Sequence, residues 1–294
     1  MCVAFNFSKV LVTYGVSKTF CPAAGLKRFS RENLNIMFER ILSLLNRTKT
    51  SISKHPLHHQ ILPEDHRSVY AIGDLHGCVS LLRRIETAIT KDLAQEEAHV
   101  VLLGDIIDRG PDSAEMLDHL LLPPPPGQVR HVLLGNHEVM FTRFFENPAR
   151  AAEWLYCGGA ETLLSYGIDA QSFTTWPPAK QRQSLQAHIP EEHRRFIANL
   201  PAILSWGNVI FAHAGIDFTK QLTDQTEDAV LWNKTPISGN NLPENTMLVH
   251  GHVPVSAPDI HQNVINMDVG AYLTNKAVIM RIEPSGLKRL IEVL

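Results

Sequence analysis

Five short apolar runs in this chain each end in glycine or another small residue, next to side chains that can bind a metal ion. In chain order these ends read Gly73-Asp74-Leu75-His76-Gly77, Gly104-Asp105-Ile106-Ile107-Asp108-Arg109-Gly110, Gly135-Asn136-His137-Glu138, His213-Ala214-Gly215 and His250-Gly251-His252. The carboxyl ends of parallel strands meet at one edge of a sheet, and glycine lets the backbone approach a bound ion closely. The pattern therefore predicts that these distant segments converge on a single metal site.

The spacing of apolar residues predicts a parallel α/β sheet around the first three of these segments. Strands are expected at 69–72, 100–103 and 129–134, and helices at 79–93 and 113–122. Strand, helix, strand, helix, strand in this order gives parallel strands joined by right-handed crossovers. The second helix is expected to be capped by Asp112 and to end before four consecutive prolines.

The second half of the domain is expected to form another sheet. A helix-rich stretch at about 139–204 reads as an insertion, and strand-like composition then returns at 209–212, 247–249, 264–267 and 277–282. Packing the two halves together predicts the fold class α/β, as a two-sheet αββα sandwich with a helical insertion.

The first 68 residues carry no such motif and are expected to form an extension and a linker before a domain at 69–294. Residues 1–31 hold five basic residues and no acidic one, which fits either a transit peptide or a start assigned too far upstream. Met37 opens an amphipathic segment and is the alternative initiator. Residues 50–68 read as a polar linker. Three histidines in this linker are expected to be solvated: His55, His58 and His59.

The composition fits a compact fold and excludes several classes of function. Of 294 residues, 44% are hydrophobic and 19% are charged, which is enough for a core and too apolar for disorder. The formal charge of -3 offers no overall field for a nucleic-acid backbone or an anionic membrane. No apolar run reaches the roughly 18–20 residues that a membrane-spanning helix needs. We expect a soluble monomer that binds neither nucleic acid nor a membrane.

Cysteine usage indicates a reducing compartment. The four cysteines, Cys2, Cys21, Cys78 and Cys157, lie far apart and form no Cys-x-x-Cys pair. This spacing indicates neither a disulfide framework nor a structural zinc knuckle, so a cytoplasmic protein is expected. Cys78 and Cys157 are expected to be packing residues, because nothing near either one indicates an activated thiol.

The candidate ligands are oxygen and nitrogen donors, with no thiolate among them. Such a mixed set suits Mn²⁺, Fe or Zn²⁺ better than a soft metal or a purely structural site. The sequence therefore implies a catalytic pair of divalent ions, for which Mn²⁺ is the first expectation.

These motifs resemble those of the calcineurin-like metallophosphoesterases, and within them the PPP-type serine/threonine protein phosphatases of bacterial kind. The resemblance spans about 69–283 and includes two further stretches, at 154–163 and 265–271. It implies one metal held by Asp74 and His76, a bridging Asp105, and a second metal held by a set of three residues. That set is Asn136, His213 and His252.

The resemblance also implies three residues that act on the substrate. His137 would donate a proton to the leaving group, Asp108 would orient His137, and the guanidinium of Arg109 would bind the phosphate. Relatives commonly carry a second phosphate-binding arginine in a Trp-x-Arg segment, where this chain has lysine at position 234. Lys234 keeps the positive charge but loses the bidentate contact, so phosphate affinity or substrate choice is expected to differ. His250 stands where relatives usually have an apolar residue, and we expect it to pack beside the site rather than bind metal.

The leading hypothesis is a metal-dependent phosphomonoesterase that acts on phosphoserine or phosphothreonine in a protein, with metal-bridging water as the nucleophile. The alternative is hydrolysis of a small phosphate compound, a dinucleoside tetraphosphate such as diadenosine tetraphosphate. Asp108 favours the protein phosphatase, because symmetrical tetraphosphatases generally lack the corresponding aspartate. A third hypothesis, a non-catalytic scaffold, is disfavoured because His137, Asp108 and Arg109 are all present.

Overall fold

The computed structural model describes residues 57–150, 152–239 and 242–294. The expected extension, with its alternative start at Met37, therefore lies outside the described residues, as does His55. Among the described helices, none has the length and apolar character needed to cross a membrane.

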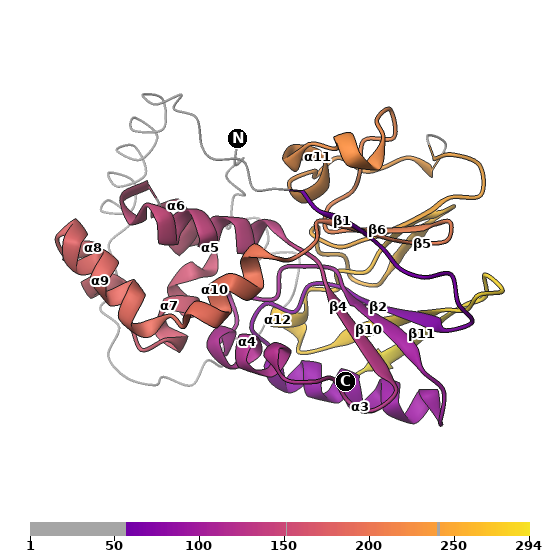
Figure 1. Cartoon of the computed structure of the whole chain (residues 1–294), viewed down its shortest axis with the longest axis horizontal. Coiled ribbons are helices and arrows are strands. Elements are labelled where there is room, and N and C mark those ends of the chain that lie inside the picture. Colours follow the sequence, from indigo (N-terminus) through magenta and orange to yellow (C-terminus); the bar gives the residue numbers. More distant parts are fainter. Residues whose placement is uncertain (1–56, 151, 240–241) are drawn as a thin grey trace, which may run out of the picture. The chain divides into compact units, whose positions relative to one another are not determined.

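Two mixed sheets form the centre of the described fold (Figure 1). One is six-stranded, in the order β1-β5-β6-β7-β9-β8, and the other is five-stranded, in the order β11-β10-β2-β3-β4. The strands are β1 (His59–Ile61), β2 (Ser68–Ile72), β3 (Ala98–Leu102), β4 (Gln128–Val132), β5 (Ile203–Trp206), β6 (Val209–Ala212), β7 (Met247–His250), β8 (Asp259–His261), β9 (Val264–Asn266), β10 (Ala277–Ile282) and β11 (Lys288–Val293). The predicted two-sheet α/β fold is confirmed.

Helices cover the outer faces and build the region between β4 and β5. The α-helices are α3 (Val79–Leu93), α4 (Ser113–Leu121), α5 (Asn136–Glu146), α6 (Ala152–Trp154), α7 (Ala160–Ser165), α8 (Ala170–Thr175), α9 (Pro178–His188), α10 (Glu191–Ala198), α11 (Glu227–Leu231) and α12 (Ala271–Thr274). A π-helical turn, η2 (Leu155–Gly159), joins α6 to α7, and two 3-10 turns are η1 (Pro148–Arg150) and η3 (Leu222–Asp224). Figure 1 shows α3 along the five-stranded sheet and α5 to α10 gathered to one side of both sheets.

The predicted alternation of strands and helices holds around the first three motifs. β2 pairs with β3, and β3 with β4, all in parallel. Helix α3 has the expected bounds and buries Leu82, Ile85 and Ile89 against the sheet, as their three- and four-residue spacing predicts. Asp112 precedes α4 as expected, but its side chain makes no capping hydrogen bond, which corrects its predicted role.

The sheets depart from the expectations in two places. The strand at 277–282, β10, was expected in the second sheet but pairs antiparallel with β2 and β11, so the five-stranded sheet is mixed. β1 lies within the expected linker and pairs in parallel with β5, where the ring of His59 lies 3.0 Å from Ser205 Oγ. The backbone carbonyl of His58 accepts bonds from the next strand as well. The predicted linker therefore contributes a three-residue edge strand, and His59 is half-buried rather than solvated, whereas His58 is exposed.

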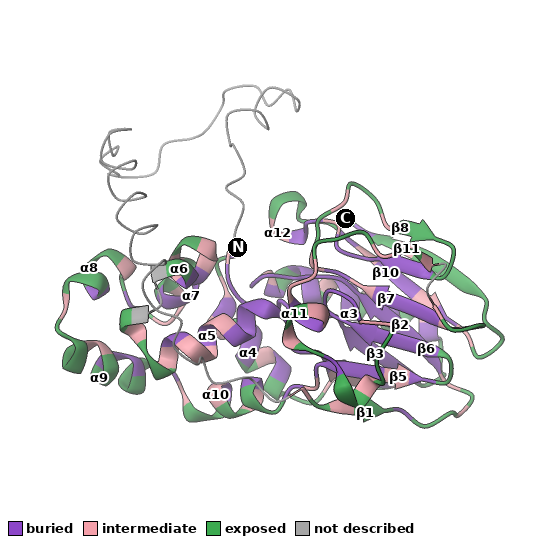
Figure 2. Cartoon of the chain, turned by 90° about the horizontal axis from the view of Figure 1, so that it is seen from above, coloured by how far each residue is buried: buried purple, intermediate pink, exposed green. Residues whose placement is uncertain are grey.

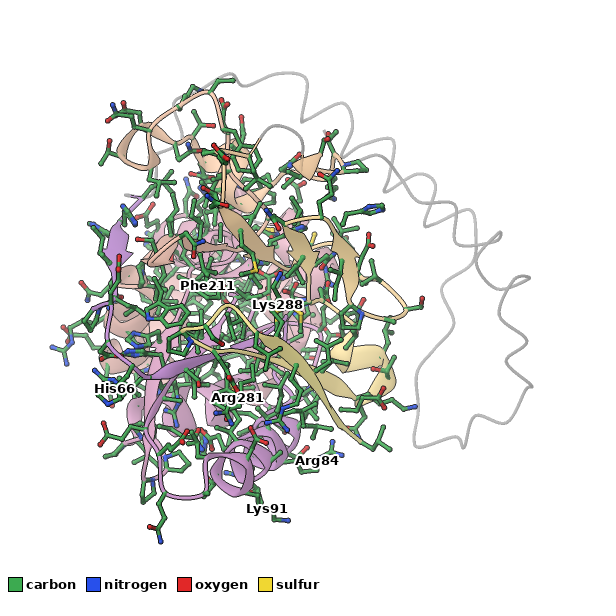
Figure 3. The ribbon with its side chains drawn as sticks, turned by 90° about the vertical axis from the view of Figure 1, so that its right-hand side faces the viewer. His66, Arg84, Lys91, Phe211, Arg281 and Lys288 are labelled. Atoms are coloured by element: carbon green, nitrogen blue, oxygen red, sulfur yellow. The ribbon has the colours of Figure 1, made fainter. Side chains whose placement is uncertain are left out.

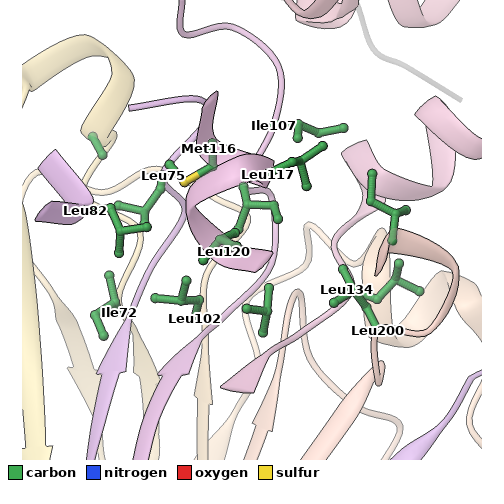
Figure 4. Packing of buried hydrophobic residues seen from close by; sticks show 14 of the residues in the cluster. Ile72, Leu75, Leu82, Leu102, Ile107, Met116, Leu117, Leu120, Leu134 and Leu200 are labelled. Atoms are coloured by element: carbon green, nitrogen blue, oxygen red, sulfur yellow. The ribbon is translucent and has the colours of Figure 1, made fainter. Parts of the chain in front are cut away.

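Two apolar clusters hold the layers together. One lies between the sheets, where Val69, Val101 and Phe211 meet from opposite sides. The other fills the space between the five-stranded sheet and the helices, where Met116 and Leu117 of α4 pack above the sheet (Figure 4). Figure 2 shows the central strands buried and much of α8 and α9 exposed.

Outside the site loops, some charged side chains lie at the outside of this core. Figure 3 places Phe211 within the interior, whereas Lys91 of α3 reaches outward. Arg281 of β10 forms an ion pair of 3.0 Å with Asp92 at the end of α3, and so ties this helix to the sheet. The arrangement leaves the carboxyl ends of β2, β3, β4, β6 and β7 free to carry the polar loops.

Candidate metal centre

The loops after five strands bring the predicted metal-binding side chains together. There are two groups of three residues in which the potential ligand atoms of each group lie within 4.8 Å of one another, and Asp105 belongs to both groups. One group is His76, Asp105 and His137, of which His137 is the predicted proton donor rather than a predicted ligand. The other group is Asp105, His213 and His252. The parallel pairing of β2, β3 and β4, and of β6 with β7, places the corresponding strand ends at a common edge.

Unusual backbone conformations concentrate at this site. Non-glycine residues with left-handed φ include His76 (45°), Asp105 (48°) and His252 (72°). Such conformations each cost about 1–3 kcal/mol and persist where surrounding contacts hold them. At Gly135 a Cβ atom would lie 2.2 Å from Asp105 Oδ1, so only glycine permits this close approach.

Backbone carbonyls fix the orientation of two histidines. His76 Nδ1–H donates to the carbonyl of Ile107 over 2.8 Å, and His213 Nδ1–H donates to the carbonyl of Leu103 over 2.9 Å. The remaining Nε2 atoms face the cluster, where His213 Nε2 lies 3.4 Å from Asp105 Oδ1. Metal-binding histidines typically donate the N–H of their other ring nitrogen to a carbonyl or carboxylate in this way.

Two buried imidazole nitrogens, His76 Nε2 and His252 Nε2, have no hydrogen-bond partner within the described residues. Buried polar atoms are rarely left unpaired, so both nitrogens are suited to a ligand that supplies the missing interaction. With Asp105 between them, the donor set is a mixture of imidazole and carboxylate. These residues fit a pair of divalent cations.

The remaining predicted ligands adjoin the two groups. Asn136 Oδ1 lies 2.9 Å from His213 Nε2, and Asp74 Oδ1 lies 4.0 Å from His213 Nδ1. Asp74 also accepts the backbone N–H of His252 over 3.2 Å. All six residues that the resemblance assigns to metal are thus collected at one place.

The electrostatics of the site favour a cation. Burial opposes ionisation of Asp105, but the nearby His213 and His137 hold the pKa of this carboxyl well below its usual value. Burial likewise opposes protonation of His213, yet Asp105 and Asp74 raise its pKa to about 10. The carboxylates therefore stabilise positive charge at this position, which divalent ions would supply.

Two other histidines of the site are kept neutral. Burial, followed by the charge of His137, holds the pKa of His76 well below its usual value. Burial and then His213 lower the pKa of His252 to about 3. A neutral imidazole is the form that binds metal.

Glu138 supports the site but has no role in the sequence-based assignment. Its buried carboxylate accepts the backbone N–H groups of Gly135, Asp105 and Ile106 over 2.8–3.0 Å. Burial and the neighbouring Asp105 raise the pKa of Glu138 to about 7. Its only sequence signal was its position directly after His137.

The three residues assigned to substrate chemistry lie side by side. His137 Nδ1 is 2.6 Å from Asp108 Oδ2, and Arg109 Nη2 donates to His137 Nε2 over 3.1 Å. The ring of Tyr272, which the sequence did not single out, lies 5.0 Å from the guanidinium carbon of Arg109. This Asp–His pair has the geometry of a proton donor and the carboxylate that orients it.

Lys234, His250 and Cys78 have more peripheral positions. Lys234 is exposed. Its positive charge helps to lower the pKa of His252, after the larger effects of burial and His213, so the electrostatic field of Lys234 reaches the site. His250 Nδ1 contacts the carbonyl of Gly251 and belongs to neither ligand group. Burial raises the pKa of Cys78, in agreement with a packing role. Among the described residues, neither Cys78 nor Cys157 forms a disulfide.

Two packed sheets with ligand-capable loops at one edge, and one carboxylate shared by two ligand groups, define the class of binuclear metallohydrolases. The model of the calcineurin-like phosphoesterase family matches residues 67–281, and the chain belongs to this family.

Similar proteins carry names that refer to a small substrate. A bis(5'-nucleosyl)-tetraphosphatase PrpE [asymmetrical] from Geobacillus thermodenitrificans is 26% identical over 243 residues, which cover 71% of this chain and 88% of the relative. The protein of the same name from Bacillus subtilis is 27% identical over 230 residues, which cover 70% and 86%. A solved structure provisionally described as a diadenosine tetraphosphatase shares the fold, with a TM-score of 0.55, 20% identity, and coverage of 81% of this chain and 99% of that one.

These names agree with the alternative hypothesis better than with the leading one. Asp108 favoured a protein phosphatase only by comparison with the symmetrical tetraphosphatases, which generally lack it. The relatives are named as asymmetrical tetraphosphatases, so that comparison does not apply to them. Hydrolysis of phosphate compounds therefore stands, whereas the preference for a phosphoprotein substrate does not.

Proposed function

We propose that this chain hydrolyses a dinucleoside tetraphosphate asymmetrically, into a nucleoside triphosphate and a nucleoside monophosphate. The observation that carries the proposal is the similarity, over most of the domain, to relatives that are named for this activity. The described site supports it with a donor set that fits two divalent ions beside Arg109, the proposed phosphate-binding residue.

In the proposed mechanism the chain holds the ions and fixes the protonation states around them. Mn²⁺ is the first expectation, with Fe or Zn²⁺ as alternatives; such ions would neutralise the phosphate oxygens and acidify an attacking water. Asp105 is the proposed bridging ligand, because it belongs to both ligand groups. Its Oδ1 accepts the backbone N–H of His137 over 3.0 Å, which fixes its orientation.

Positive side chains would bind the polyphosphate. The guanidinium of Arg109, half-buried between His137 and Tyr272, is the proposed main contact to the phosphate that is attacked. Lys234 is the proposed second contact, on the His252 side of the site. A tetraphosphate has more anionic oxygens than a monoester, so two separated cations suit it.

Product analysis tests the proposal. The full chain, loaded with Mn²⁺, is incubated with diadenosine tetraphosphate, and the nucleotides are separated by ion-exchange chromatography. We expect ATP and AMP in equal amounts. The Asp105→Asn variant is the control for contaminating hydrolases and should release neither nucleotide. Two molecules of ADP would show symmetrical cleavage, and an unchanged dinucleotide would refute the proposal.

Phosphoserine or phosphothreonine in a protein remains a second candidate substrate, and the Asp108–His137 pair favours it. A positioned proton donor matters most when the leaving group is a strongly basic alkoxide, and less when it is a nucleotide phosphate. A phosphothreonine peptide is therefore assayed beside the dinucleotide at equal concentrations. A kcat/KM that is higher for the peptide would favour the protein phosphatase.

A further inference from the structure

We propose that the segment from Trp154 to Thr162 is the positioning element of the proton donor. In this proposal Trp154 and Thr162 fix the Asp108 carboxylate, and Gly158 fixes Arg109. The inference rests on the proposed hydrolytic function, but it does not depend on which phosphate compound is the natural substrate.

The Asp108 carboxylate is bound on both of its oxygens by this segment. The indole Nε1–H of Trp154 donates to Oδ2 over 2.6 Å, the same oxygen that receives His137 Nδ1–H. The hydroxyl of Thr162 donates to Oδ1 over 2.6 Å. Since the side chain of Asp108 is fully buried, these donors replace the water that would otherwise solvate its charge.

The same segment holds the backbone of the turn that carries both residues. Asp108 and Arg109 are consecutive non-glycine residues with left-handed φ, at 72° and 64°. The backbone N–H of Asp108 donates to Thr162 Oγ1 over 3.1 Å, and that of Arg109 donates to the carbonyl of Gly158 over 3.0 Å. A strained turn of this kind keeps its conformation only where such contacts determine it.

A kink at Gly158 explains how the segment reaches Arg109. The backbone of Gly158 is non-helical (φ 118°, ψ 2°), and beside it the carbonyl of Cys157 accepts Arg109 Nε–H over 3.4 Å. Gly158 has φ 118°, and a Cβ there would lie 2.6 Å from both the backbone N and Cγ of Arg109. Only glycine therefore allows this close approach to Arg109.

Trp154 is itself held firmly, so it can act as a fixed donor. Its ring lies 4.5 Å from that of Phe144 and 5.7 Å from that of Phe141, measured between centroids. Gly159 allows the chain to pass over the indole, since a Cβ there would lie 2.2 Å from the ring. The helices between β4 and β5 therefore serve the proton donor directly.

Aryl phosphates with different leaving groups test the inference. Phenolate has a conjugate-acid pKa of about 10 and needs protonation, whereas the less basic p-nitrophenolate needs little. In Trp154→Phe, which keeps a packed ring and removes the donor, we expect kcat on phenyl phosphate to fall roughly 10- to 100-fold, less than the full 10²–10⁴-fold effect of a general acid. On p-nitrophenyl phosphate kcat should fall less than about threefold, with KM and metal content unchanged.

Matched variants separate positioning from packing. Thr162→Val should show the same split between the two substrates, and Thr162→Ser should restore activity because it keeps the hydroxyl. Trp206→Phe is the control, because Trp206 is also buried but its indole nitrogen has no hydrogen-bond partner within the described residues. This control should leave the ratio of the two kcat values at the wild-type level.

A measurement without turnover completes the test. In the Zn²⁺-loaded full chain, the Nδ1–H proton of His137 should give a protected NMR signal that exchanges faster in Trp154→Phe and Thr162→Val but not in Trp206→Phe. An equal loss of kcat on both aryl phosphates would overturn the inference. So would an unchanged exchange rate of the His137 Nδ1–H proton in Trp154→Phe and Thr162→Val. The proposed tetraphosphatase function is judged separately, by the products from the dinucleotide.

Discussion

At the scale of single residues, Asp105 connects both halves of the candidate metal site. It belongs to both ligand groups, its Oδ1 accepts the backbone N–H of His137, and its own N–H donates to Glu138. A substitution at this residue therefore changes the metal site while the surrounding strands retain their packing.

We expect Asp105→Asn to lose at least one metal ion and nearly all turnover, while the protein remains folded. The amide keeps the shape of the side chain but removes the charge that a bridging ligand must supply. Elemental analysis after metal loading, together with circular dichroism, measures both effects. Asp112→Asn is a matched control, because the Asp112 side chain makes no capping bond. Two bound ions and near-normal activity in Asp105→Asn would contradict the bridging assignment.

Lys234 allows a second test at this scale. If it contacts phosphate, Lys234→Arg should lower KM by adding a two-point contact, and Lys234→Ala should raise KM roughly threefold to fivefold, as expected for an exposed charge. Arg109→Ala should have a larger effect than either, because Arg109 is the proposed main contact. Steady-state kinetics on diadenosine tetraphosphate give the order. An unchanged KM in Lys234→Ala would identify a solvated surface lysine.

At the scale of elements, the π-helical turn η2 links the helices between β4 and β5 to the site. Gly158→Ala should raise KM for phosphate substrates and lower the free energy of unfolding by about 1–3 kcal/mol, because the new Cβ both strains the backbone and displaces Arg109. Chemical denaturation and steady-state kinetics measure the two effects.

Gly167→Ala is the control for this prediction. Gly167 also has a positive φ, 78°, but nothing lies within 4 Å of the position of its Cβ. This variant should therefore lose some stability and leave KM unchanged. A KM that rises equally in both variants would show that backbone strain alone, rather than contact with Arg109, causes the effect.

The elements that could be predicted are those with a local signal. Helix α3 shows a clear helical period, and β2, β3 and β6 are continuous buried runs. β1 and β8 are three residues long and mostly exposed, so they show no alternation to detect. β1 depends on its pairing with β5, which is distant in the sequence. β8 depends on its antiparallel pairing with β9.

At the scale of the whole molecule, residues 1–36 are expected to be dispensable. A chain beginning at Met37 should keep full specific activity and an unchanged Tm, because all candidate ligands and every described strand follow it. Thermal unfolding and turnover of diadenosine tetraphosphate check this. Loss of folding would show that residues 1–36 contribute to the domain.

A shorter chain, beginning at residue 69, provides the comparison. It lacks β1 and the first residue of β2, so it exposes the edge of β5 and removes the contact between His59 and Ser205. We expect a lower Tm for this chain than for the one beginning at Met37. An equal Tm would mean that β1 adds nothing to the stability of the sheet.

The sequence by itself determined which residues could bind metal and that they would meet, because strand ends in a parallel sheet converge whatever the intervening loops contain. Only the tertiary structure decided what holds these residues in place. Trp154 donates a hydrogen bond to Asp108, which lies 46 positions away in the chain. Glu138 accepts the backbone N–H of Asp105, which lies 33 positions away. Such contacts leave no periodic trace in the sequence, because they depend on a few atoms brought together by the folding of separate elements. Their physical basis is the burial of the charge of Asp108 and Glu138, which requires donors that only the assembled fold can supply.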